Sequence, residues 1–189
     1  GIDIIYNLAA LISIPYSYKS PESYLDVNIY GTFNLLNAAR KYKIKKFFQI
    51  STSEVYGSAE YIPIDENHPL KAQSPYAATK IAADQISYSF MCSFDLPIVI
   101  LRPFNIFGPR QSLRAIIPTI ISQVINDKEE INLGNIYSTR DLNFVEDTIN
   151  IMIAMINLKN HLIIGKVFNI GSGYEISIKQ LVNKISIIA

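Results

Sequence analysis

Tyr76 and Lys80 are the two residues whose types and spacing point most directly to chemistry. They stand four positions apart in the run Tyr76-Ala77-Ala78-Thr79-Lys80, and residues at that spacing share one face of a helix. An ammonium beside a phenol stabilises the phenolate and lowers a pKa that is ordinarily ~10. The pair is therefore predicted to be a general base that takes a hydroxyl proton while a hydride leaves the same carbon.

An isolated pair of this kind is more often an exposed tyrosine and lysine without a role, so the surroundings decide. The run Ser51-Thr52-Ser53-Glu54 follows a short apolar segment, which places hydroxyls and a carboxylate at the end of a predicted strand. Ser74-Pro75 is a helix N-cap followed by proline. Tyr76 and Lys80 therefore lie in the first turns of a helix, and ligands of open α/β sheets bind at the carboxyl edge of the strands.

Alternating strands and helices must position these groups. Apolar runs predict buried strands at 2–5, 47–50 and 98–101, and helical periodicity predicts helices at 22–42 and 75–94. Strand, helix, strand, helix, strand at these spacings is typical of right-handed crossovers in a parallel sheet. The fold class is therefore predicted to be α/β.

The pattern is looser after residue 110. It predicts helices at 116–125 and 144–156, strands at 130–133 and 166–170, and a last helix that begins after Ser177. We expect residues 1–112 to form the part of the sheet domain that carries the Tyr and Lys. Residues 113–189 are expected to form mainly a smaller substrate-binding region that partly returns to the sheet.

Composition excludes several classes of protein. The chain has 189 residues, of which 49% are hydrophobic and 17% charged, so intrinsic disorder is not expected. The formal charge of +1 lacks the basic excess of a nucleic-acid or membrane surface. Two histidines and Cys92 are too few for a structural zinc site. We therefore expect no metal site. Because the sequence has no long apolar run and no basic leader at residues 1–5, we expect a cytoplasmic protein.

Seven motifs together resemble the extended short-chain dehydrogenase/reductase family of nucleotide-sugar-modifying enzymes. They recur in the order and approximate spacing of that family, and the resemblance covers essentially the whole chain. The motifs are Asn7-Leu8-Ala9-Ala10, Asn28-Ile29-Tyr30-Gly31-Thr32, Ser51-Thr52-Ser53-Glu54-Val55-Tyr56-Gly57, Tyr76 with Lys80, Arg102-Pro103-Phe104-Asn105 with Gly108-Pro109-Arg110, Thr139-Arg140-Asp141 through Asp147, and Asn169-Ile170-Gly171-Ser172-Gly173.

The resemblance implies a set of site residues and NAD as the cofactor. The implied catalytic residues are Thr52, Ser53, Glu54, Tyr76 and Lys80. The residues implied to contact NAD are Leu8, Ala9, Ala10, Asn28, Ser51, Tyr76, Lys80 and Phe104. Those implied to contact a UDP- or GDP-linked hexosamine are Asn105, Arg110, Arg114 and Arg140. A guanidinium grips paired phosphate oxygens, so Arg140 is the candidate for the pyrophosphate, with a surface pair to Asp141 as the alternative.

Glu54 separates the activities within the family. Epimerases usually have a non-acidic residue there, whereas 4,6-dehydratases place a carboxylate there. The implied reaction is oxidation at C4, removal of the C5 proton by Glu54, loss of water from C6 and return of hydride to C6. Some dehydratases have an aspartate where this chain has Ser53, and a hydroxyl is a poor acid, so protonated Glu54 is the substitute acid. The motifs most resemble N-acetylhexosamine nucleotide dehydratases of the legionaminic-acid branch of bacterial surface-sugar synthesis.

Three alternatives stay open: a nucleotide-sugar 4-epimerase, a UDP-glucuronate-type decarboxylase, and an inactive truncated remnant. The family's Gly-rich turn after the first strand is not found in this sequence. The chain is therefore expected to be a partial Rossmann-type sheet without its N-terminal strands, roughly 55–60% of a ~330-residue protein, and not active by itself. The resemblance also implies a homodimer through the helices at 22–42 and 75–94.

Overall fold

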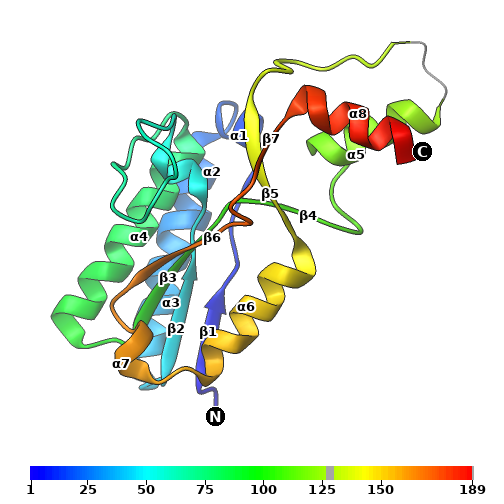
Figure 1. Ribbon diagram of the computed structural model, residues 1–189. Coiled ribbons are helices and arrows are strands. Elements are labelled where there is room, and N and C mark those ends of the chain that lie inside the picture. Colours follow the sequence, from blue (N-terminus) through cyan, green and yellow to red (C-terminus); the bar gives the residue numbers. More distant parts are fainter. Residues whose placement is uncertain (127–129, 189) are drawn as a thin grey trace. The chain divides into compact units, whose positions relative to one another are not determined.

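The computed structural model describes residues 1–126 and 130–188 (Figure 1). The chain forms two compact units. The first contains residues 1–103 and 151–170, and the second contains residues 104–150 and 171–189. The first unit is therefore assembled from two separate stretches of sequence, and each unit is described below by itself.

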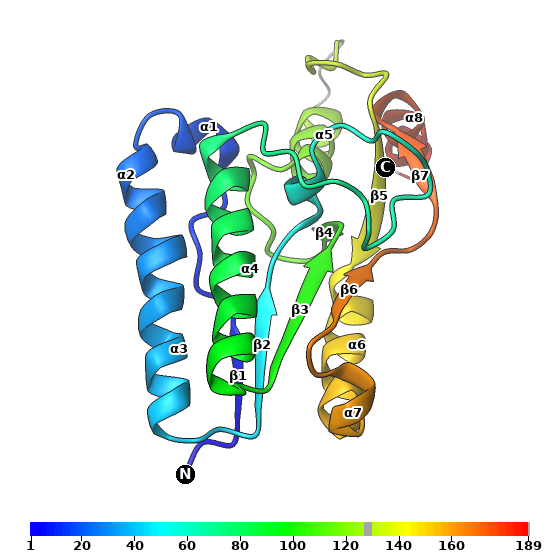
Figure 2. The same ribbon diagram turned by 90° about the vertical axis from the view of Figure 1, so that its left-hand side faces the viewer.

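A four-stranded parallel sheet is the centre of the first unit. Its strands are β1 (Ile4–Asn7), β2 (Lys46–Ile50), β3 (Ile98–Pro103) and β6 (Val167–Ile170), in the order β1-β2-β3-β6 (Figure 2). All three neighbouring pairs are parallel, as the crossover arithmetic predicts. The α/β fold class with a Rossmann-type parallel sheet is confirmed, and the carboxyl ends of these strands share one edge.

Helices cover both faces of this sheet (Figure 2). Alternate residues of the strands point to opposite faces, so Phe47 packs with α3 and α4 while Phe48 packs against Met155 and Ile163. The helical elements of the unit are α1 (Ile14–Ser17), α2 (Pro21–Tyr24), the π-helix η1 (Leu25–Tyr30), α3 (Gly31–Lys41), the 3₁₀-helix η2 (Ser53–Tyr56), α4 (Pro75–Phe94), α7 (Asn160–Ile163) and the last seven residues of α6 (Val145–Asn157).

Helix α4 begins at the residue that the cap-and-proline pattern predicts. The Ser74 hydroxyl accepts a hydrogen bond from the Ala77 amide at 3.1 Å, and Pro75 fills the first helical position. At the other end Asp95 takes the left-handed conformation, with a φ of 53°. The cap fixes the first turn of the helix, and Tyr76 lies in that turn.

Replacing Ser74 by alanine is expected to lower the free energy of unfolding by about 1 kcal/mol, because the Ala77 amide loses its acceptor. Denaturant titration measures the change. Ser89→Ala is the control, since Ser89 is an exposed serine in the interior of the same helix. Equal losses in the two variants would contradict a capping role.

The second unit contains a small mixed sheet. Strands β4 (Asn105–Phe107), β5 (Thr139–Phe144) and β7 (Glu175–Ser177) have the order β4-β5-β7, with the first pair parallel and the second antiparallel. Helices α5 (Ile116–Ile125) and α8 (Ile178–Ile188) pack through a core centred on Ile120, Ile178 and Leu181. The sequence predicts both helices but none of these three strands.

The strand predicted at 130–133 is wrong, since these residues form no strand. The Gln123 side chain explains this locally. It accepts a hydrogen bond from the Asn132 amide at 2.7 Å and donates one to the Asn132 carbonyl at 3.1 Å. A side chain of α5 thus takes the backbone groups that a strand partner would need.

In the part of the chain that the structure describes, no helix has both the length and the apolar character needed to cross a bilayer.

Candidate active site

The candidate catalytic residues gather at the carboxyl end of β2. Ser51 and Thr52 follow the strand directly, and the Thr52 hydroxyl caps η2 by accepting a hydrogen bond from the Glu54 amide at 3.2 Å. Gly57 ends the turn with a φ of 67°, against the Lys71 carbonyl, where a Cβ atom would not fit. The local sequence therefore fixes a tight turn that carries Glu54, whose side chain is half-buried.

Tyr76 and Lys80 are both buried, with 7% and 4% of their surface exposed. The Lys80 ammonium donates a hydrogen bond to the Ile50 carbonyl, the last residue of β2, at 2.5 Å. Burial lowers the pKa of Lys80, and the Asp84 carboxylate raises it. Helix α4 thus places Lys80 at the carboxyl end of β2, just before the run Thr52-Ser53-Glu54, as the sequence predicts.

The Tyr76 phenol has the opposite pKa shift from the one predicted. Burial raises the pKa of Tyr76 to about 12, a hydrogen bond from Thr52 lowers it, and the negative charge of Glu54 raises it further. Lys80, whose ammonium is hydrogen-bonded to the Ile50 carbonyl, is not among the groups that shift this pKa. The prediction that Lys80 brings this phenol toward neutral pH is therefore wrong for this structure.

Glu54→Gln is expected to lower the pKa of Tyr76 from about 12, because a neutral amide no longer disfavours the nearby phenolate. Phenolate absorbance during an alkaline titration measures this, with the Tyr76→Phe curve subtracted to isolate one residue. An unchanged or higher midpoint would show that the carboxylate does not face the phenol.

Asn28 connects the loop after β1 to helix α4. Its side chain exchanges two hydrogen bonds with the Leu11 backbone, at 2.8 and 3.0 Å, and donates a third to the Thr79 hydroxyl at 3.0 Å. Thr79 in turn donates to the Tyr76 carbonyl at 2.8 Å. Asn28 lies in the π-helix η1, and such wide turns are frequent at functional sites.

The remaining candidates for a cofactor in the first unit lie at the same strand edge. Leu8 and Ala9 are exposed and Ala10 is half-buried, directly after β1. The Ser51 hydroxyl is committed to the Asp84 carboxylate at 2.9 Å. Of the three residues after β1, Ala9 and Ala10 are small, so their side chains cover little of the backbone there.

Sequence reasoning missed a buried ion pair behind these groups. Asp84 and Arg102 are 0% and 4% exposed, and the Arg102 Nε lies 3.2 Å from the Asp84 carboxylate. Burial raises the pKa of Asp84, whereas Arg102, Ser51 and Lys80 lower it. The available signal is that Asp84 stands four residues after Lys80, on the same helix face, where an apolar residue is expected.

The substrate-binding candidates belong to the second unit, as does Phe104, the last of the NAD candidates. Arg110, Arg114 and Arg140 are exposed; Phe104 and Asn105 are half-buried. Arg140 donates to the Thr139 carbonyl at 2.7 Å. The neighbouring Asp141 instead accepts hydrogen bonds from the Ser172 amide and hydroxyl and from the Gly173 amide. The guanidinium is thus not held by the carboxylate beside it.

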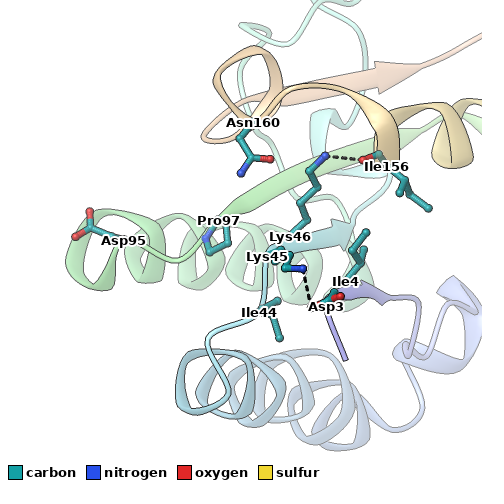
Figure 3. A pocket seen from close by; sticks show the side chains of 9 residues that line it. All are labelled: Asp3, Ile4, Ile44, Lys45, Lys46, Asp95, Pro97, Ile156 and Asn160. Carbon is teal, nitrogen blue, oxygen red and sulfur yellow. Dashed lines mark hydrogen bonds and ion pairs between the residues drawn. The ribbon is translucent and has the colours of Figure 1, made fainter. Parts of the chain in front are cut away.

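An open hollow of about 640 Å³ lies at the opposite, amino-terminal edge of the first sheet (Figure 3). Its two lysines are engaged: Lys46 donates to the carbonyls of Ile156 and Leu158, and Lys45 pairs with Asp3 at 3.3 Å. This hollow therefore offers no free cationic group to a ligand. Among residues 1–126 and 130–188, no group of three or more His, Cys, Asp or Glu side chains is arranged to hold a metal ion.

Comparison with known proteins gives consistent matches. A family model described as GDP-mannose 4,6 dehydratase matches residues 1–188. The dTDP-D-glucose 4,6-dehydratase of Dictyostelium discoideum is 34% identical over 97% of this chain and 44% of its own length. The crystal structure of UDP-glucuronic acid 4-epimerase from Bacillus cereus, in complex with UDP-glucuronic acid and NAD, is 35% identical with a TM-score of 0.92; the match covers 99% of this chain and 59% of that one.

A third relative is TunA, described as an NAD-dependent NDP-hexosamine 5,6-dehydratase involved in tunicamycin biosynthesis. Its structure is 29% identical with a TM-score of 0.89, and the match covers 99% of this chain and 61% of that one. The chain thus spans about half of the first curated relative and about three fifths of these solved structures. These relatives include two proteins named as dehydratases and one named as an epimerase.

Proposed function

The chain belongs to the family of the GDP-mannose 4,6 dehydratase model, and we propose that its protein is an NAD-dependent nucleotide-sugar 4,6-dehydratase. The observation that carries this proposal is the placement of Glu54. Its half-buried carboxylate lies on the turn after β2, close enough to the Tyr76 phenol for its charge to add to the effect of burial in raising the pKa of Tyr76. A dehydratase needs such a second base beside the first, because it removes a carbon-bound proton as well as a hydroxyl proton.

The residues present fit NAD as the cofactor. A buried phenol and an ammonium share the strand edge with the small residues Ala9 and Ala10, which leave room for a flat ring. We propose that Leu8, Ala9, Ala10, Asn28, Ser51, Tyr76, Lys80 and Phe104 hold it. NAD supplies a hydride acceptor that returns the same hydride at the end of the cycle.

The protein's own residues then move the protons. Tyr76, with the Thr52 hydroxyl beside it, takes the proton of the C4 hydroxyl as the hydride leaves C4. The new ketone acidifies C5, and Glu54 takes the C5 proton. The C6–oxygen bond breaks, and the leaving hydroxide receives a proton from Glu54, with Ser53 next to it as the hydroxyl partner. Hydride returns to C6, and the proton that Tyr76 took from the C4 hydroxyl returns to C5, which gives a 4-keto-6-deoxy sugar and water.

Lys80 has two roles in this scheme. In the structure its ammonium holds the strand end through the Ile50 carbonyl. Its second proposed role is to hold NAD, together with Tyr76, at the same strand edge.

We propose that the substrate is a UDP- or GDP-linked N-acetylhexosamine and that the second unit binds it. Residues 1–112 supply the cofactor and catalytic groups, and residues 113–189 supply most of the substrate-binding region. Arg140 is proposed to bind the pyrophosphate. Arg114, with Asn105 and Arg110 from the end of the first range, is proposed to lie around the nucleotide and sugar. The support is the exposed Arg140 guanidinium, free of Asp141, and the description of TunA as a hexosamine dehydratase. The place proposed is bacterial surface-sugar synthesis, in the legionaminic-acid branch.

A homodimer is part of the proposal. Helices α3 and α4 pack side by side, and their outer surface exposes Phe33, Tyr88 and Phe94. A second copy covering these aromatic side chains through the same two helices is the arrangement that the sequence resemblance implies.

A 4-epimerase is the second candidate, because the neighbour from Bacillus cereus carries that activity in its name. The whole protein is incubated with UDP- and GDP-N-acetylglucosamine and the products are weighed by mass spectrometry. We expect the loss of one water. No change in mass with a changed sugar supports an epimerase, loss of CO₂ from the corresponding uronate supports a decarboxylase, and no product from any of them refutes the proposal.

A further inference from the structure

A buried polar cluster lies behind the catalytic pair, on the far side of Lys80 along helix α4. Asp84 is one helical turn after Lys80, and one carboxylate oxygen accepts hydrogen bonds from the Ser51 hydroxyl at 2.9 Å and from Arg102 Nε at 3.2 Å. Its other oxygen has no hydrogen-bond partner among the described residues. Asp84 therefore ties the catalytic helix both to the first residue after β2 and to β3.

Arg102 continues the cluster toward the turn that carries Glu54. Its Nη1 donates to the Tyr56 hydroxyl at 3.1 Å, and its guanidinium carbon lies 5.1 Å from the centre of the Tyr56 ring. The Tyr56 hydroxyl donates in turn to the Asn169 side chain at 2.7 Å. Tyr56 is fully buried and is the last residue of η2, two positions after Glu54.

Stability alone does not explain the buried ion pair between Asp84 and Arg102. Removing two charges from water offsets much of their attraction, and well-packed apolar residues of similar volume are often as stable as a buried ion pair. What the pair does provide is geometry. It adds a fixed link between two elements that also contact each other directly: the helix with Tyr76 and Lys80, and the turn with Glu54.

We propose that Arg102 and Asp84 are positioning residues that, through Tyr56, hold Glu54 at the distance from Tyr76 and Lys80 that elimination requires. This inference rests on the proposed dehydratase function. It assigns no contact with the substrate to the pair; Arg102 and Asp84 act through the residues that they hold.

The proposal separates the two chemical steps. Oxidation at C4 depends on Tyr76 and Lys80, which α4 and the Ile50 carbonyl hold without Tyr56. Removal of the C5 proton depends on Glu54, which the Arg102–Tyr56 contact holds. Loosening this contact should therefore slow elimination and leave oxidation largely unchanged, whereas a general loss of structure would slow both.

Tyr56→Phe in the whole protein is the test, because it keeps the buried ring and removes only the hydroxyl between Arg102 and Asn169. Tyr6→Phe is the matched control: it removes another tyrosine hydroxyl hydrogen bond of the first unit, to the Met152 carbonyl, away from the ion pair. Rapid mixing follows oxidation by the absorbance of the reduced nicotinamide, and mass spectrometry of quenched samples follows the loss of water.

For Tyr56→Phe we expect elimination to slow by about 10- to 100-fold, as misplacement of a catalytic group by about 1 Å does, with oxidation within about twofold of wild type. Reduced cofactor then accumulates, which it does not in Tyr6→Phe. Equal slowing of the two steps, or no slowing, overturns the inference. A wild-type protein that releases no water overturns the proposed function itself, so the two failures are distinguishable.

Arg102→Lys is a second variant that tests the same inference. A lysine keeps the charge opposite Asp84 but lacks the fork that reaches both Asp84 and Tyr56. The same selective loss of elimination is expected, with thermal stability above that of Arg102→Met, which leaves the Asp84 charge unpaired. A lysine variant that eliminates water at the wild-type rate overturns the positioning role of the guanidinium.

Discussion

Replacing Tyr76 by phenylalanine is expected to lower kcat by about 10³-fold, the typical contribution of one general acid–base group. The change removes only the hydroxyl, and the ring continues to pack edge-on against Tyr24. The proposed scheme gives this proton to no other residue: Glu54 takes the C5 proton, and the Lys80 ammonium, hydrogen-bonded to the Ile50 carbonyl, has no lone pair to accept one. Both oxidation and water loss should stop, because oxidation precedes elimination.

The measurement is a single-turnover assay that follows nicotinamide reduction, with thermal unfolding of the same sample. Tyr137→Phe is the control, because Tyr137 is an exposed tyrosine with no proposed catalytic, binding or dimer role, and its turnover should match wild type. A Tyr76→Phe protein that reduces the cofactor at an undiminished rate would remove the phenol from the mechanism.

Glu54→Gln is expected to stop the reaction after its first half. The amide has nearly the shape of the carboxylate but cannot take the C5 proton, so water loss should slow by about 10³-fold. Oxidation at C4 does not need Glu54 and should proceed. The protein is therefore expected to accumulate reduced cofactor together with a 4-keto sugar that retains its C6 hydroxyl.

Mass spectrometry of the bound sugar and exchange of the C5 hydrogen with heavy water both report this block. Glu60→Gln is the matched control, because Glu60 is an exposed glutamate in the same loop, paired with Lys71 at the surface. If the Glu54 variant turns over at the wild-type rate and releases an epimerised sugar, the enzyme is an epimerase and the carboxylate is not its second base.

Local signals explain how much of the first unit could be predicted. Ile98–Leu101 is a continuous apolar run, as buried parallel strands require. The pair Ser74-Pro75 predicts the first residue of helix α4 correctly. Apolar runs and helix caps depend only on neighbouring residues. The sequence therefore predicts these strands and helices, and with them the carboxyl edge of the sheet at which Thr52, Glu54 and Tyr76 meet.

Non-local pairing explains what could not be predicted. Strand β5 contains Arg140, Asp141 and Asn143, and its partners β4 and β7 are three residues each, so no segment alone has the composition of a strand. The contact of Asp84 with Arg102 depends on how α4 packs on β3. The pKa of Tyr76 was predicted in the wrong direction because burial, which no spacing rule reports, outweighs a lysine that binds elsewhere.

The two-segment construction of the first unit has a consequence for synthesis on the ribosome. Strand β3 finds its neighbour β6 only at residues 167–170, and the buried Lys46 finds its carbonyl acceptors only at Ile156 and Leu158. Until those residues emerge from the exit tunnel, the nascent chain keeps an unpaired strand edge and an uncovered apolar face beside Phe48 and Leu101. Co-translational folding of this unit must therefore wait for the intervening residues, and chaperones that recognise such surfaces have their longest access during that interval.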